Sequence, residues 1–209
     1  MEAFDQQIHH RGYLPHVDGA DYQFITYHLI DSLPKAALES LQAFRGNTKT
    51  FRIEQWLNQG HGECVLNNPR SAQTVIDNWK HHDNKLYELL AYTVMPNQVH
   101  VLIKVFPGQK LSRIIHAWKS YTSKKIQAII GAGEPPALPV QAKEHARIWQ
   151  ADYFDRYIRD ERHLNQTVQY IYENPVKAGL VKRIENWPFS GGRLWTAGGP
   201  PASSPGMRS

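Results

Sequence analysis

Alternating and helically spaced apolar residues divide the chain into strands and helices. β-Branched and aromatic residues dominate 22–30, 86–94 and 99–105, which predicts three strands. A Met-Pro-Asn turn at 95–97 separates the last two. Because a Pro-Asn pair favours a turn, we expect these two strands to form an antiparallel hairpin.

Apolar residues at helical spacing predict helices over 35–44, from Pro69 onward, over 111–131 and over 160–174. The last helix is expected to end before Pro175, because the residue preceding a proline disfavours the helical conformation. The order strand, helices, hairpin, helix, helix predicts an α+β domain. Its antiparallel sheet would carry helices on one face.

The length of 209 residues suits one domain, which we expect to span residues 1–195. Segment 131–147 is rich in proline and is interpreted as a loop insertion. From 196 onward Gly, Pro and Ser dominate, which predicts a disordered tail.

The composition also indicates a compartment. Cys64 is the single cysteine, so no intramolecular disulfide can form, which is typical of a reducing cytosol. No apolar run approaches the roughly 18 residues of a membrane span, and the first ten residues do not resemble a secretion signal. We therefore expect a cytoplasmic protein without a membrane partner.

Positive charge is concentrated in the middle of the chain. The formal net charge is +5, and no Asp or Glu occurs from Leu89 to Gly133. A basic surface interleaved with aromatic residues attracts phosphate and stacks bases, which indicates a nucleic-acid partner. The candidate phosphate contacts are Lys104, Lys110, Arg113, Lys119, Lys124 and Lys125.

Two pairs of residues could carry chemistry. Gln98 and His100 lie two positions apart on a predicted strand, so their side chains share a face. Tyr170 and Asn174 lie one turn apart on the last predicted helix. On spacing alone, ordinary packing is the better explanation of both pairs.

Several blocks of sequence resemble the REP-associated tyrosine transposases of the HUH endonuclease superfamily. The most specific are VMPNQVHVL at 94–102 and YIYENPVKAGL at 170–180, with further matches at RGYLPH, WKS, WQ, FDRYIRDE and WPFS. The resemblance covers about residues 11–193.

This resemblance implies a ferredoxin-like α+β core and a helix-borne tyrosine nucleophile, Tyr170. It also implies Mg²⁺ or Mn²⁺ held by His100, by Asn174 and by position 98. The family has histidine at that position, whereas this chain has Gln98. A glutamine oxygen suits Mg²⁺, but it lacks the second ring nitrogen that orients a histidine ligand, so we expect weaker metal binding.

The implied activity is nicking and strand transfer on single-stranded DNA that carries REP-type hairpins, through a 5′-phosphotyrosine. The sequence leaves open whether the enzyme is a monomer or a homodimer. An alternative is a hairpin-binding protein in which Gln98 weakens cleavage. A generic RNA-binding ferredoxin-like domain is less favoured, because the matches concentrate around His100 and Tyr170. Tyr153 and Tyr157 are rival nucleophiles.

Overall fold

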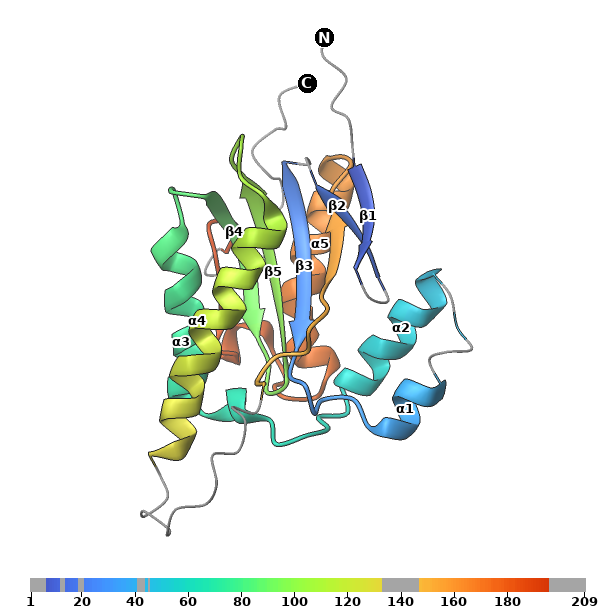
Figure 1. Cartoon of the computed structure of the whole chain (residues 1–209), viewed down its shortest axis with the longest axis vertical. Helices are drawn as coiled ribbons and strands as arrows, with labels where there is room; N and C mark the ends of the chain where they lie inside the picture. The colour runs from blue at the N-terminus through green and yellow to red at the C-terminus, as the bar shows by residue number, and fades with distance from the viewer. Residues whose placement is uncertain are drawn as a thin grey trace.

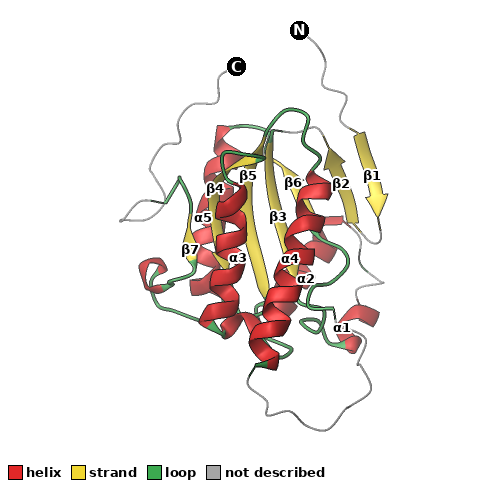
Figure 2. Ribbon diagram, turned by 60° about the vertical axis from the view of Figure 1, so that its left-hand side comes forward, coloured by secondary structure: helices red, strands yellow, loops and turns green. Residues whose placement is uncertain are grey.

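A central antiparallel sheet organises the computed structural model, which describes residues 7–11, 14–18, 21–40, 44, 46–132 and 147–195. The spatial order of its strands is β6-β3-β5-β4-β7 (Figure 1). Their bounds are β3 (Tyr22–His28), β4 (Tyr87–Val94), β5 (Gln98–Val105), β6 (Phe154–Tyr157) and β7 (Ser190–Gly191). A separate two-stranded sheet, β1 (Gln7–Arg11) with β2 (Leu14–Asp18), lies beside β6 (Figure 2).

Helices cover both faces of this sheet. Figure 2 shows α3 and α4 in front of the sheet, and Figure 1 shows α5 behind it. The helices are α1 (Lys35–Ser40), α2 (Gly46–Leu57), α3 (Pro69–His82), α4 (Leu111–Gly131) and α5 (Glu161–Lys177), with short 3-10 turns at Val65–Asn67 and Ile184–Asn186.

Four strands of the sheet, β3, β4, β5 and β6, have the ferredoxin-like order. β3 and β5, the first and third of the four in the chain, lie side by side at the centre, and β6 and β4 flank them. α3 and α4 form the two crossovers and pack on the same face of the sheet. The structure therefore confirms the predicted α+β fold with an antiparallel sheet, and β7 extends it beyond β4.

Strand alternation separates two hydrophobic cores. Val99, Val101 and Ile103 of β5 face α3 and α4, where Trp79 and Trp118 are completely buried. Leu102 faces the other way and packs with residues of α5 such as Ile171. Because His100 alternates with these valines, it lies on the α5 face.

The prediction of helices on one face is therefore wrong, and so is the predicted end of the last helix. α5 continues through Pro175 to Lys177. In the final turn a missing proline N–H removes only one helical hydrogen bond. Gly179, at φ +72°, then ends the helix. The amides of Gly179 and Leu180 donate to the carbonyls of Val176 and Pro175, the pattern of a Schellman cap.

Some elements were not predicted from the sequence. α2, β6, β7 and the β1–β2 hairpin are absent from the expected set, and the predicted helix over 35–44 is described as α1 as far as Ser40, with residues 41–43 outside the described part of the chain. The predicted insertion at 131–147 falls almost wholly outside the described residues, and the predicted tail at 196–209 falls wholly outside them. None of the helices that the structure describes is long and apolar enough to cross a membrane.

A half-buried lysine fastens α4 to the segment that precedes β6. The Lys119 ammonium group donates to the carbonyl oxygens of Gln150, Ala151 and Asp152, at 3.0, 3.3 and 2.8 Å. It also lies 5.4 Å from the ring centre of Tyr27. Burial lowers the pKa of Lys119 to about 8. Lys119 therefore satisfies backbone carbonyls that water reaches poorly.

We expect Lys119→Met to lower the free energy of unfolding by about 1–3 kcal/mol, because three carbonyl acceptors lose their donor. Lys124→Met is the matched control on an exposed position of the same helix and should change stability by less than about 0.5 kcal/mol. Urea denaturation followed by circular dichroism measures both. Equal effects of the two substitutions would show that Lys119 has no special structural role.

Candidate active site

The structure brings three of the predicted site residues into contact between β5 and α5. The Nδ2 atom of Asn174 lies 3.0 Å from Nε2 of His100, and both side chains are buried. The rings of His100 and Tyr170 pack edge to face with centroids 5.5 Å apart. Tyr170 and Asn174 are one helical turn apart and therefore lie side by side on α5, as expected.

Hydrogen bonds fix the proton on the His100 ring. An amide nitrogen only donates, so Nε2 of His100 accepts from Asn174. Nδ1 therefore carries the proton and donates to Oγ1 of Thr26, 2.8 Å away on β3. Burial lowers the pKa of His100 to about 3, which keeps the ring neutral at physiological pH. A neutral imidazole whose other nitrogen is held by a hydrogen bond is the form that binds a metal ion.

Gln98 is buried on the same face of β5 as His100. Its Nε2 atom donates to Oδ1 of Asn58 at 2.9 Å, whereas its Oε1 atom is buried without a hydrogen-bond partner. A buried carbonyl oxygen without a partner is destabilising by about 1–3 kcal/mol. Position 98 therefore retains an oxygen that a cation could satisfy.

These donors fit a divalent cation only in part. Gln98 offers an amide oxygen, His100 a ring nitrogen, and Asn174 an amide oxygen if its side-chain amide makes a half-turn. All three groups are neutral. Among the described residues, no group of three or more His, Cys, Asp or Glu is arranged to hold a metal. A hard cation that prefers charged oxygen ligands would be held weakly here.

Tyr170 lies in an aromatic and charged environment. The Phe24 ring stacks on His100 at 5.9 Å and meets Tyr170 edge to face at 5.7 Å. The Lys177 ammonium group lies 5.5 Å from the centre of the Tyr170 ring. Burial raises the pKa of the Tyr170 hydroxyl, and so does the neighbouring Glu54 charge. The hydroxyl is therefore protonated at neutral pH and needs a proton acceptor before it can attack.

Glu54, which sequence reasoning missed, lines the same hollow as Tyr170, and each side chain shifts the pKa of the other. Burial raises the pKa of Glu54, while the neighbouring Tyr170 hydroxyl and the positive charges of Arg156 and Lys177 lower it. Glu54 lies on α2, which the sequence analysis did not predict. The available signal was the helical spacing of Ile53, Trp56 and Leu57, which pack together with Leu33 in a small cluster.

Thr26 was also missed. It pairs with His100 in the β3–β5 register, and that pairing aligns the hydroxyl with the ring nitrogen. A threonine in a predicted strand is common, so composition gave no reason to select it. Its role depends on the register, which the sequence did not determine.

The rival tyrosines lie on the other side of the sheet. Tyr153 packs against the core formed with α3 and α4. On β6, Arg156 pairs with Phe24 and shares its face, so Tyr157, the next residue, points to the opposite face. Glu161, four residues after Tyr157, is the first residue of α5, whereas Tyr157 lies on β6, so the two are not one turn apart on a helix.

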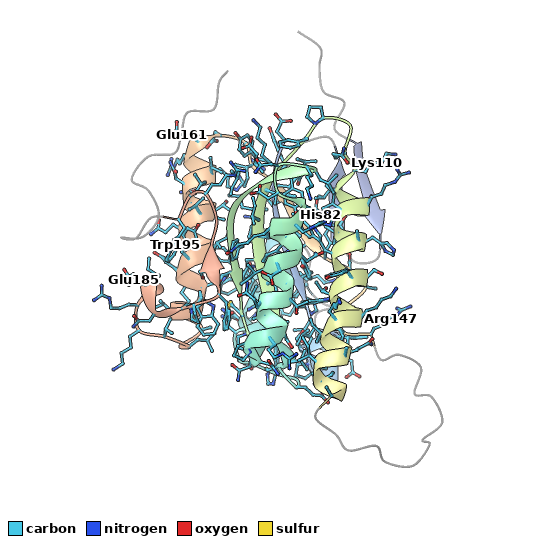
Figure 3. All side chains as sticks on the ribbon, turned by 90° about the vertical axis from the view of Figure 1, so that its left-hand side faces the viewer. His82, Lys110, Arg147, Glu161, Glu185 and Trp195 are labelled. Atoms are coloured by element: carbon cyan, nitrogen blue, oxygen red, sulfur yellow. The ribbon has the colours of Figure 1, made fainter. Side chains whose placement is uncertain are left out.

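The basic residues are not gathered around Tyr170. Lys110, Arg113, Lys124 and Lys125 are exposed on or beside α4, across the sheet from α5. Figure 3 shows Lys110 and Glu161, at the starts of α4 and α5, on opposite sides of the molecule. Lys104 is on the His100 face of β5 and lies 5.5 Å from the Tyr22 ring centre. The prediction that Lys119 contacts phosphate is corrected, because its ammonium group is hydrogen-bonded to three backbone carbonyls.

Comparisons with known proteins show which family the chain belongs to. The family model described as "Transposase IS200 like" matches residues 69–174, slightly more than half of the chain. A Haemophilus influenzae protein named as a candidate REP-associated tyrosine transposase is 25% identical over 115 residues, which cover 50% of this chain and 58% of that protein. A REP-associated tyrosine transposase of Escherichia coli is 46% identical over 43 residues, covering 21% and 26% of the two chains.

The matched region thus spans less than two thirds of the length of these relatives. A solved structure of a REP-associated tyrosine transposase bound to a REP hairpin has a TM-score of 0.47 and 21% identity, covering 87% of this chain and 80% of that one. The family model includes β5, with Gln98 and His100, and α5 as far as Asn174. Because this model spans more than half of the chain, the protein belongs to the IS200-like transposase family.

Proposed function

We propose that this protein is a REP-associated tyrosine transposase that nicks and rejoins single-stranded DNA bearing hairpins, with Tyr170 as nucleophile. The contact of Tyr170 with both His100 and Glu54 carries the proposal, because it joins a nucleophile, a candidate metal ligand and a proton acceptor. The names of the relatives point to REP elements as the kind of DNA on which the protein acts.

In the proposed reaction the Tyr170 oxygen attacks a phosphodiester phosphorus and its proton passes to the Glu54 carboxylate. A new phosphorus–oxygen bond forms to Tyr170, and the bond to the 3′ oxygen breaks. That oxygen takes a proton from water, which leaves a 3′-hydroxyl and a 5′-phosphotyrosine. In strand transfer a 3′-hydroxyl gives its proton back to water and its oxygen attacks the phosphotyrosine phosphorus. The bond from phosphorus to Tyr170 breaks, and Glu54 returns its proton to the Tyr170 oxygen. The bond energy is conserved throughout, so no nucleotide cofactor is required.

A divalent cation, Mg²⁺ or Mn²⁺, bound by Gln98, His100 and Asn174 would polarise the scissile phosphate and offset its developing charge. Thr26 would keep Nε2 of His100 unprotonated, and the Asn174 amide would turn so that its oxygen rather than its nitrogen faces the ion. The wholly neutral ligand set supports a second candidate function, a hairpin-binding protein in which cleavage is slow. Hairpin binding is common to both proposals, and the nicking rate distinguishes them.

Tyr170→Phe should abolish the covalent protein–DNA adduct and leave affinity for hairpin DNA nearly unchanged, since only a hydroxyl is removed. Denaturing gel electrophoresis with labelled single-stranded hairpin DNA and Mn²⁺ detects the adduct. Tyr153→Phe and Tyr157→Phe are the matched controls and should retain it. An adduct that survives in Tyr170→Phe would assign the nucleophile elsewhere.

Glu54→Gln should slow adduct formation by about 10²–10⁴-fold, because the Tyr170 proton loses its acceptor while the size of the side chain is preserved. Single-turnover nicking and DNA affinity should be measured together, and affinity should not change. Glu161→Gln provides the control, because Glu161 is an exposed carboxylate at the start of α5. Nicking at the normal rate in Glu54→Gln would exclude Glu54 as the acceptor.

Gln98→His should tighten Mn²⁺ binding and accelerate nicking, each by about 10–100-fold, because a ring nitrogen held by a second hydrogen bond is a better ordered ligand. The Mn²⁺ dependence of the unfolding temperature reports binding without reference to activity. Gln169→His, at an exposed position of α5, should leave both properties unchanged. No gain in Gln98→His would mean that position 98 is not a ligand or already functions best as glutamine.

A further inference from the structure

A hollow of about 310 Å³ opens directly beside Tyr170. Its walls come from β3, α2, β6 and α5, four elements that are distant in the sequence. This volume is at the small end of the range of about 300–1,000 Å³ for ligand sites, which suits one nucleoside rather than a duplex. Its lining consists of Phe24, Phe51, Glu54, Phe154, Arg156, His163, Gln166, Thr167 and Tyr170.

The apolar part of this lining is aromatic. The exposed fraction of Phe51 is 57%, so an aromatic ligand that enters the hollow can reach its ring. The Arg156 guanidinium group, a second planar group in the lining, lies over the Phe154 ring, 5.4 Å from its centre. Aromatic rings and guanidinium planes are the groups on which unpaired bases stack in single-strand binding proteins.

The polar part of the lining suits a neutral ligand that forms hydrogen bonds. Arg156 and Glu54 carry opposite charges, and burial and the charge of Arg156 lower the pKa of His163, so the lining has little net charge. A free anion would meet the Glu54 carboxylate. Glutamine and arginine side chains, such as Gln166 and Arg156, are suited to paired hydrogen bonds with the edge of a base.

We propose that this hollow binds one unpaired nucleobase of the DNA strand, next to the phosphate that Tyr170 attacks. The inference rests on the proposed function. A phosphodiester held at the Tyr170 hydroxyl has a nucleoside on each side, and Tyr170 itself forms part of the wall of the hollow. Phe51 supplies a stacking ring and Gln166 contacts the edge of the base, so the site selects the nucleotide at the cleavage position.

The test uses Tyr170→Phe protein without metal, so that binding is measured independently of cleavage. Hairpin oligonucleotides with a single abasic residue at successive positions beside the cleavage site are compared with intact DNA by fluorescence anisotropy. Adding Phe51→Ala should weaken binding of intact DNA by about 5- to 150-fold, which is the contribution of one stacked base to the affinity. The loss should disappear on DNA that is abasic at one position.

Phe51→Tyr should restore affinity because it retains a stacking ring. Tyr121→Ala removes another exposed aromatic ring, on α4, and any loss that it causes should persist on abasic DNA. Gln166→Ala should change the preference among the four bases at the same position. A Phe51→Ala loss that is equal on intact DNA and on every abasic DNA overturns the inference. The adduct assay on the unmodified protein tests the proposed function separately, so either proposal can fail alone.

Discussion

A hydrogen bond between the His100 ring and the Asn174 amide joins the central strand β5 to helix α5 inside the protein. The opposite ring nitrogen is bound to Thr26 on the neighbouring strand. With both nitrogens engaged and the ring buried, His100 has one orientation and one protonation state. Because Tyr170 lies one helical turn before Asn174, the same bond sets the position of the tyrosine against the ring. The geometry of the candidate active site depends on this contact.

Charges around the tyrosine act in opposite directions. Burial and the charge of Glu54 favour the protonated hydroxyl of Tyr170, whereas the neighbouring Asn174 side chain and the charge of Arg156 favour the phenolate. Lys177 lies over the tyrosine ring on the same helix. Arg156 and Lys177 thus provide positive charge at the nucleophile itself, and the α4 residues provide it on the opposite face of the sheet. Positive charge therefore occurs on both faces of the sheet, beside Tyr170 on one and along α4 on the other.

The sequence predicted the strands and helices whose patterns are long, such as the β4–β5 hairpin and α4. His100, Tyr170 and Asn174 were found because the blocks around them resemble a known family, and not from their spacing alone. Thr26 could not be found because its role depends on the strand register. Glu54 could not be found because α2 has a weak pattern and reaches Tyr170 only through tertiary packing. Pro175 was misread because the signal that ends α5 is Gly179, four residues later.

The bonds from His100 to Thr26 and to Asn174 each close 74 residues of chain, in opposite directions along the sequence. Contacts of such long sequence separation form late in folding, after the loop-closure entropy has been overcome. A chain emerging from the ribosome contains His100 and Thr26 well before α5 exists. Under the proposed function, Tyr170 reaches the candidate metal ligand His100 only when the domain is almost complete, so a partly folded chain does not cut DNA.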